Sequence, residues 1–282
     1  MASAKRLISK FTEVKPLPAV AIRVTQLANS ESTTIQDFEE IIKLDPVLVM
    51  RLLRLVNSPF FGLTSKVESI SKAVVFVGLQ QLRNLVAVEA ARDFFSEANG
   101  QSEFPRKNLW VNSATVAVLA QLISRRIFGK KGDDVFLAAI LHDIGLVVED
   151  QVVPDEFHSS CSDYVSGEKP LLFVAEDEKI GTNHTKIGEL MASDWKLPED
   201  VIQAIRFHHD HDTSYPVPSV ISILQLAEFM TCKLKYGVVF DKIDPLPSYL
   251  QQHLKAKMAE YKVLLKSLPE EMKKAEELFK GA

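Results

Sequence analysis

The chain has 282 residues, of which 46% are hydrophobic, and a formal net charge of -4 at pH 7. This apolar content is enough to bury a large core, which argues against a disordered chain. The slightly acidic balance gives no general attraction to phosphates, so we expect no nucleic-acid partner. No apolar run approaches the roughly 20 residues that span a bilayer, and Met1 to Lys10 lack a signal-peptide stretch. We therefore expect a cytoplasmic protein without a membrane partner.

Apolar residues recur at helical rather than strand spacing in the first hundred residues, which predicts short helices there. Three groups of residues mark where these helices begin or end: Pro16 with Pro18, Asp45-Pro46, and Asn57-Ser58-Pro59 before Gly62. The polar stretch from Glu97 to Arg106 is interpreted as a linker between two lobes.

The rest of the chain shows the same spacing, so the predicted fold is all-α, with two helical lobes and a helical tail. Helices are expected near 109–128, 133–144, 183–195, 198–210 and 217–235, with a mixed connector after the second. The domains are predicted as an N-terminal lobe (1–100), a second lobe (101–240) and a C-terminal tail (241–282). The amphipathic tail from Ser248 to Lys280 is expected to pack back on the body rather than join a partner.

Two other features point to structure rather than chemistry. Cys161 and Cys232 lie far apart and form no CxxC pair, so they indicate neither a disulfide framework nor a cysteine-based zinc site. The segment from Thr33 to Gly62 has the outline of a helix-turn-helix, but its second helix is mostly Leu, Val and Met. That composition favours a core helix over one exposed in a DNA groove.

Six of the seven histidines lie between His142 and His211, and four of them end or begin apolar helical stripes. His142 closes a stripe beside Asp143, on a helix that Gly145 is expected to terminate. His184 begins one helical pattern, and His208 with His209 ends another. Buried imidazoles need partners for both ring nitrogens, so several that converge on one core indicate a bound metal or mutual contacts.

The remaining histidines, His158, His211 and His253, lack comparable settings and are interpreted as surface residues. The acidic run from Glu176 to Glu178 precedes His184, and its charges are expected to be mostly solvated. If one of its carboxylates approaches the metal region, we expect Glu178.

Two separated blocks of the sequence carry a family resemblance over roughly residues 11 to 235. The runs Leu141 to Gly145, Asn183-His184, Trp195 to Pro198 and Ile205 to His209 resemble the HD superfamily of metal-dependent phosphohydrolases. In the first half, the resemblance is to the HDOD branch, the HD-related output domain of bacterial signalling proteins. It rests there on Leu17-Pro18, Asp45-Pro46, Arg51 to Arg54, Asn57 to Pro59, Phe61-Gly62, Ile70 to Leu79 and Leu82 to Leu85.

The resemblance implies a divalent metal, which this chain need not retain, and two of its ligand positions depart from the family pattern. Asn112 stands where a histidine is expected, and its neutral amide is a weaker ligand than imidazole. Glu228 replaces an aspartate, on a helical stripe with Ile221 and Leu224 that should face the interior. The candidate metal ligands are therefore His142, Asp143, His184, His208, His209 and Glu228, with Asn112 as a degraded position.

These departures favour a regulatory signalling module of the HDOD type over a catalyst. Its implied partners are signalling proteins and, as a small ligand, a cyclic dinucleotide or another nucleotide. The alternative is a metal-dependent phosphohydrolase or phosphodiesterase that acts on a nucleotide, with His142, Asp143, His208 and Glu228 holding the cation.

Overall fold

The computed structural model describes residues 2–14, 20, 23–24, 27, 34–95, 104–236, 239–240 and 242–275. Within these ranges every regular element is a helix, so the all-α prediction is confirmed. The predicted linker (97–106) lies mostly outside the described residues, as do Pro16 and Pro18. Among the residues described, no single helix is both long and apolar enough to cross a bilayer, and only the pair 70–77 and 79–95, bent by 116°, passes that test together.

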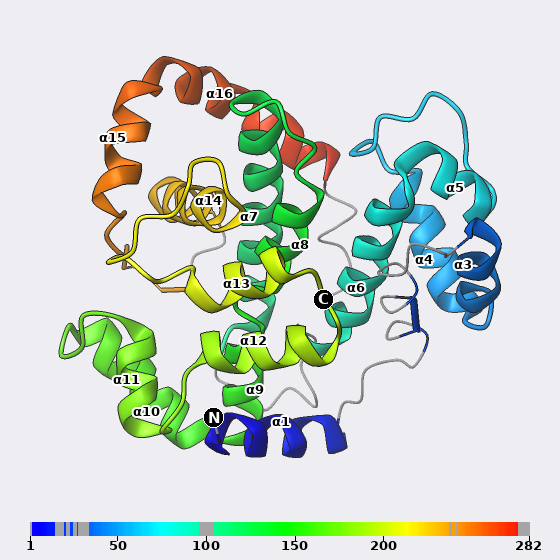
Figure 1. The fold of residues 1–282 in the computed structure, drawn as a ribbon. Helices are drawn as coiled ribbons and strands as arrows, with labels where there is room; N and C mark the ends of the chain where they lie inside the picture. The colour runs from blue at the N-terminus through cyan, green and yellow to red at the C-terminus, as the bar shows by residue number, and fades with distance from the viewer. Residues whose placement is uncertain are drawn as a thin grey trace.

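The first half of the chain forms α1 and a group of helices gathered around α6 (Figure 1). Their bounds are α1 Ala2–Val14, α3 Ile35–Ile42, α4 Pro46–Val56, α5 Ile70–Val77 and α6 Leu79–Phe95. The predicted start and end of α4 are confirmed. Asp45 accepts hydrogen bonds from the backbone N–H groups of Val47 and Leu48, at 3.1 and 3.0 Å, and Asn57 caps the other end.

The second half contains the five predicted helices and three more within the connector. The bounds are α7 Arg106–Arg126, α8 Asp133–Leu141, α9 Ile144–Val152, α10 Pro154–Ser166, α11 Leu172–Lys179, α12 His184–Asp194, α13 Glu199–Phe207 and α14 Val220–Leu234. The connector was expected to be mixed; α10 is rich in polar residues, and the apolar first half of α11 is followed by four charged residues. α7 packs against α8 and α14, and α12 packs between α9 and α13.

The prediction that one helix runs through residue 144 and ends at Gly145 is wrong. α8 stops at Leu141, His142 caps it, and Asp143 precedes the first turn of α9. Gly145 lies inside α9, where a Cβ atom would come within 2.1 Å of the backbone oxygen of His184. The glycine therefore allows α9 and α12 to pack closely, and this contact places His184 near Asp143.

Helices α1 and α6 of the first half contact the second half. α1 lies across α9 and α12 (Figure 1), and Phe94 of α6 packs against Trp195, with 5.9 Å between ring centroids. At the start of α8, the buried Arg83 of α6 lies 3.2 Å from Asp134, and Asn84 donates to the carbonyl of Asp133 at 2.8 Å. The lobe boundary predicted at residue 100 stays a prediction. α1, which was assigned to the first lobe, packs on α9 and α12 of the second.

The tail packs back on the body, as expected. It forms α15 (Ser248–Ala256) and α16 (Met258–Lys274), and α16 lies along α7 with Glu271 2.9 Å from Arg126. On α16, Leu264 and Leu268 are buried, whereas Met258 is 40% exposed.

Replacement of Gly145 by alanine should destabilise the protein, because the new methyl group would meet a backbone atom that cannot rotate away. We expect a loss of about 3 kcal/mol in the free energy of unfolding, at the upper end of typical overpacking costs. Denaturant unfolding measures it. Gly167→Ala is the matched control: nothing lies within 4 Å of its added Cβ, and the positive φ of 85° there costs only about 1 kcal/mol. Equal losses in the two variants would contradict the close-packing role of Gly145.

Candidate metal centre

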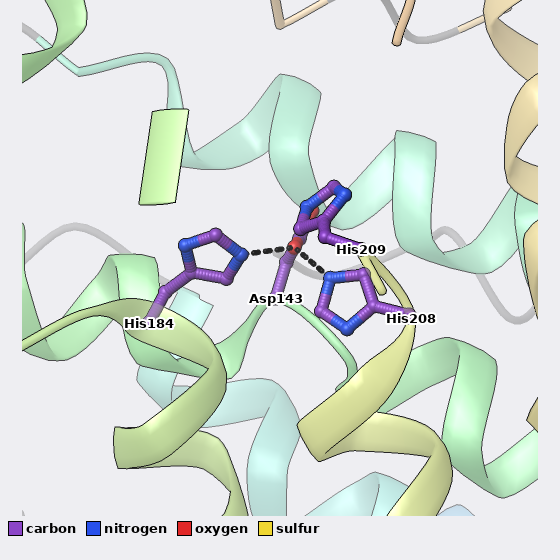
Figure 2. A group of neighbouring side chains, drawn as sticks. All are labelled: Asp143, His184, His208 and His209. Atoms are coloured by element: carbon purple, nitrogen blue, oxygen red, sulfur yellow. Dashed lines mark ion pairs between the residues drawn. The ribbon is translucent and has the colours of Figure 1, made fainter. Parts of the chain in front are cut away.

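Side chains that are far apart in the sequence meet at the break between α8 and α9 (Figure 2). Oδ1 of Asp143 lies 3.8 Å from Nε2 of His184 and 3.6 Å from Nε2 of His208. The His208 and His209 ring centroids are 4.1 Å apart, and Nε2 of His142 lies 3.2 Å from the other Asp143 oxygen. The predicted convergence of these residues is thus present, while their role as ligands stays a prediction.

Three of the histidines have one ring nitrogen fixed by a hydrogen-bond acceptor. Nδ1 of His142 lies 2.7 Å from the carbonyl oxygen of Ala139, and Nδ1 of His208 lies 2.8 Å from that of Ile205. Nδ1 of His184 lies 2.7 Å from a carboxylate oxygen of Glu176. Because each partner accepts, Nδ1 carries the proton, and in the neutral ring Nε2 presents its lone pair.

The Nε2 atoms of His142, His184 and His208 are buried and have no hydrogen-bond partner among the described residues. A buried polar atom without a partner is costly, and here three of them face one carboxylate. Imidazole nitrogen and carboxylate oxygen together suit Zn²⁺, Mn²⁺, iron or Ni²⁺. The residues present therefore fit a divalent cation.

The candidate ligand atoms form two overlapping groups. Asp143, His184, His208 and His209 make up the first; His142, His208 and Glu228 make up the second; within each group the ligand atoms lie within 4.8 Å of one another. His208 belongs to both groups.

Burial and mutual charge set the protonation of the site. Burial lowers the pKa of His142, but the adjacent Asp143 carboxylate outweighs burial and raises that pKa to about 9. Burial alone would raise the pKa of Asp143, yet His142 and the other histidines hold it well below its usual range. Burial lowers the pKa of His208 to about 4 and raises that of Glu228 to about 8. A bound cation would therefore compete with protons on His142 and Glu228.

Asn112 and Glu228 both line the pocket that contains Asp143 and the histidines. The Asn112 side-chain nitrogen donates to the backbone oxygen of Tyr236 at 3.4 Å. The side-chain nitrogen therefore bonds to the protein, and Asn112 can offer a cation only its neutral carbonyl oxygen.

The expectation that Glu178 is the acid nearest the metal region is wrong. The Glu178 side chain is 56% exposed and pairs with Lys169, whereas Glu176 is fully buried and contacts His184. α11 turns Leu172 and Glu176 inward, one helical turn apart. The spacing of Glu176 from Leu172 is the sequence signal that could have identified Glu176 as the inward-facing acid.

The segment 242–247, between α14 and α15, closes one side of the pocket and was not predicted to do so. The Tyr164 hydroxyl donates to Asp244 at 2.9 Å, and the other Asp244 oxygen lies 3.5 Å from Nδ1 of His209. Lys242 donates to the backbone oxygens of Tyr164 and Lys169, at 2.9 and 3.1 Å. These contacts hold an acidic and a basic side chain at the pocket.

His211 lines the same pocket, and His158 and His253 are only partly exposed, so none of the three is a plain surface residue. His158 lies 3.2 Å from Asp150, and His253 stacks on Phe128 with 5.4 Å between ring centroids.

Loss of His208 should weaken cation binding more than loss of His209, because His208 belongs to both donor groups. We expect His208→Ala to lower the affinity for Mn²⁺ or Zn²⁺ by roughly 100-fold or more, since even residues that only orient a ligand contribute about 10- to 100-fold. Competition with a chromophoric chelator measures the affinity. His253→Ala, which lies outside the pocket, is the control. Equal losses for His208→Ala and His209→Ala would show that the two groups do not share this residue.

The raised pKa of Glu228 predicts a pH-dependent stability in cation-free protein. The folded carboxyl stays protonated up to about pH 8, whereas the unfolded one ionises near 4.5. The stabilising contribution is therefore complete below pH 4.5 and disappears as the pH rises through about 8. Thermal melting in chelator should show wild type losing stability relative to Glu228→Gln across this range, while the exposed Glu178→Gln control runs parallel to wild type. Parallel curves for Glu228→Gln would refute the shift.

Comparison with known sequences gives a family. The family model of the HDOD domain matches residues 14–211, which is 198 of the 282 residues. A curated relative from Treponema pallidum (strain Nichols), described as an uncharacterized protein, is 29% identical over 213 residues, 73% of this chain and 40% of that protein. The chain thus spans less than half the length of that relative.

Solved bacterial structures share the fold. A "putative phosphohydrolase" of Shewanella amazonensis SB2B aligns with a TM-score of 0.72 and 25% identity, over 96% of this chain and 97% of that one. An HDOD domain protein of unknown function from Geobacter sulfurreducens gives 0.66 and 22%, over 94% and 97%. A "putative signal transduction protein" of Marinobacter aquaeolei VT8 gives 0.66 and 19%, over 98% and 64%. With the family model covering well over half of the chain and these helical folds alongside it, the protein belongs to the HDOD family.

Proposed function

We propose that this protein is a regulatory HDOD module whose pocket binds a divalent cation and, through it, a small anionic ligand. The observation that carries the proposal is the set of three buried imidazoles around Asp143, those of His142, His184 and His208. In each, Nδ1 is held by an acceptor and Nε2 faces the Asp143 carboxylate. His142, His184 and His208 would supply nitrogen ligands, and Asp143 an oxygen ligand. A bound cation would supply a positive charge on which a phosphate-bearing ligand such as a nucleotide could dock.

The surroundings of the pocket favour binding over turnover. A catalytic metal must be held firmly and keep an open position for water. Here Asn112 offers no imidazole, and Glu228 ionises reluctantly because burial raises its pKa to about 8. Asp244 places a further carboxyl beside His209, and Lys242 donates to backbone oxygens. A bound metal ion would therefore have to supply the positive charge on which an anionic ligand docks.

The contacts between the two halves support a route from the pocket to the first lobe. α8 begins at Asp133 and Asp134, which are held by Asn84 and Arg83 of α6, and it ends at His142. Helix α8 therefore connects His142, a candidate metal ligand, to α6. A ligand that shifts His142 would bias how α6 sits on α8.

The first lobe exposes large apolar side chains that a signalling protein could cover. Leu44 is 64% exposed, Met50 66% and Val75 73%, on or beside α4 and α5. Exposed apolar side chains of this size, where they gather, are typical of protein interaction surfaces. We propose this lobe as the output surface.

A second candidate function is hydrolysis of a nucleotide phosphate. It is favoured by the second donor group, in which His142, His208 and Glu228 could hold a cation beside Asp143, and by the phosphohydrolase name of the Shewanella relative at 25% identity. In this case the pocket would bind the same ligands but release a cleaved product.

One experiment separates the two candidates. Protein loaded with Mn²⁺, Mg²⁺, Fe²⁺ or Ni²⁺ is offered a panel of nucleotides and cyclic dinucleotides, and binding and turnover are measured in parallel. We expect calorimetric binding of the cation, which His142→Ala weakens, and no turnover above the background of His142→Ala. Turnover that His142→Ala abolishes would establish the hydrolase, and absence of any cation binding would end both candidates.

A further inference from the structure

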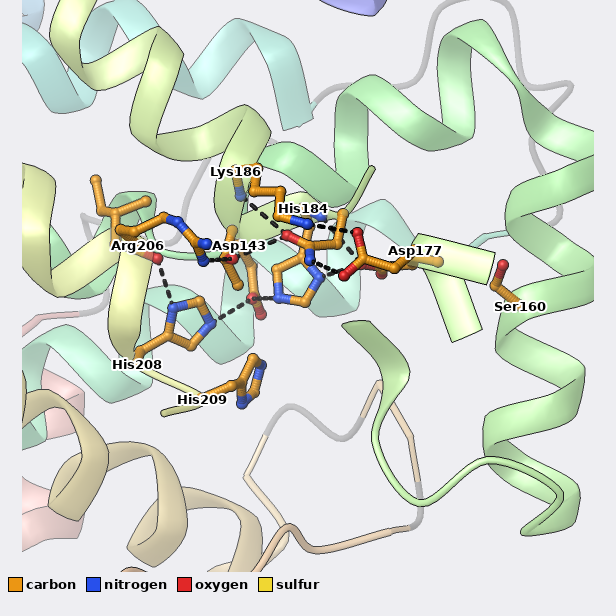
Figure 3. A network of polar contacts seen from close by, with 12 residues as sticks. Asp143, Ser160, Asp177, His184, Lys186, Arg206, His208 and His209 are labelled. Carbon is orange, nitrogen blue, oxygen red and sulfur yellow. Dashed lines mark hydrogen bonds and ion pairs between the residues drawn. The ribbon is translucent and has the colours of Figure 1, made fainter. Parts of the chain in front are cut away.

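Two fully buried carboxyl groups lie behind His184, on the side away from Asp143. Glu149 comes from α9 and Glu176 from α11, and both have a relative exposure of 0%. One oxygen of each and a ring nitrogen of His184 lie within 4.8 Å of one another. Figure 3 shows the polar network around His184, with Asp143 and His208 on one side of its ring and Asp177 on the other.

Only part of this carboxyl pair is satisfied by hydrogen bonds. Oε2 of Glu176 accepts from the His184 backbone N–H at 3.0 Å and from its ring Nδ1 at 2.7 Å. Oε1 of Glu176 and both oxygens of Glu149 are buried without a hydrogen-bond partner among the described residues. Buried polar atoms are rarely left unpaired, so a hydrogen bond between the two carboxyl groups is expected here.

The charges nearby also leave the pair incomplete. The next residue, Asp150, is balanced by Arg106, whose Nε lies 2.5 Å away. No lysine or arginine among the residues described forms an ion pair with Glu149 or Glu176, and the single ionic partner found there is His184. Two adjacent buried carboxyl groups of this kind cannot both ionise. Burial, and then the neighbouring Glu176, raises the pKa of Glu149 well above its usual range.

Within the pair, Glu176 is the hydrogen-bond acceptor. Its Oε2 already accepts two hydrogen bonds from His184. Glu149 accepts none, so the proton belongs on Glu149.

We propose that Glu149 is a positioning residue: as a neutral carboxylic acid it donates a hydrogen bond to the free oxygen of Glu176. This bond fixes the Glu176 carboxylate on Nδ1 of His184 and leaves Nε2 free to face the cation site. The effect on cation affinity rests on the proposed function, because it requires a cation in the pocket. His184 differs here from His142 and His208, whose Nδ1 atoms meet neutral backbone carbonyls. A carboxylate partner makes the imidazole a stronger electron donor, so the pair tunes one ligand of the set.

Three substitutions and a control test the role of Glu149. In Glu149→Gln the amide N–H can still donate to Glu176, so cation affinity should stay close to that of wild type. In Glu149→Leu the donor is lost, and the Zn²⁺ or Mn²⁺ dissociation constant should rise by about 10- to 100-fold. The melting temperature should also fall in that variant, because the loss of the donor leaves the free oxygen of Glu176 buried without a partner. Ser160→Ala, buried nearby but bonded only within α10, should change neither quantity.

Glu176→Gln gives a signature that packing alone would not produce. Its amide can donate to Nδ1 of His184 and select the opposite tautomer, which places hydrogen on Nε2 and blocks it as a ligand. Long-range ¹⁵N–¹H NMR of the histidine rings in cation-free protein reports the tautomer directly. We expect Nδ1–H for His184 in wild type and Glu149→Gln, and a shift toward Nε2–H in Glu176→Gln.

The outcomes separate this proposal from the proposed function. Wild-type affinity in Glu149→Leu would overturn it, as would equal losses of affinity and melting temperature in the Gln and Leu variants. If the wild-type protein takes up no cation, the proposed function fails. The tautomer of His184 in Glu149→Leu then decides the positioning role alone: an unchanged Nδ1–H population overturns it, and a mixed or inverted one supports it.

Discussion

The arrangement of the candidate site depends on one local interaction, the hydrogen bond from a histidine Nδ1 to a carbonyl at the end of its own helix. His142 caps α8 and His208 caps α13, and each bonds the carbonyl three residues before it. The last carbonyls of a helix lack partners within the helix. The same bond therefore completes the helix end and turns Nε2 away from it, so that two helix termini aim their imidazoles at Asp143.

Close helix packing then brings these termini together. Gly145 lets α9 approach the backbone of His184, and a Cβ atom at Gly188 would come within 2.7 Å of the Ile205 side chain on α13. α12 therefore packs closely against both α9 and α13. The distances between Asp143, His184 and His208 follow from these two contacts more than from any attraction among the polar groups, which are costly to bury.

How much could be predicted from the sequence depended on how local each cause was. The caps of α4 and the helices α7, α12, α13 and α14 follow from neighbouring residues, and they were predicted to within a few positions. α1, α10 and α11 were missed because they carry many polar residues and hold their place through contacts with distant elements. The apolar α9 was missed because no turn residue marks its separation from α8. To choose Glu176 over Glu178, one had to know which face of α11 points into the protein. The approach of Asp244 to His209 depends on the path of the chain after α14, and no pattern in the sequence records it.

The end of the family match has a consequence for how such pockets diverge. The matched region stops at residue 211, yet Glu228 on α14 and the segment 242–247 complete the pocket wall. Asp143 and the four candidate histidines lie inside the matched region, whereas this part of the pocket lining lies beyond it. A match to the family model therefore does not specify the side chains that a ligand would meet on this side of the pocket.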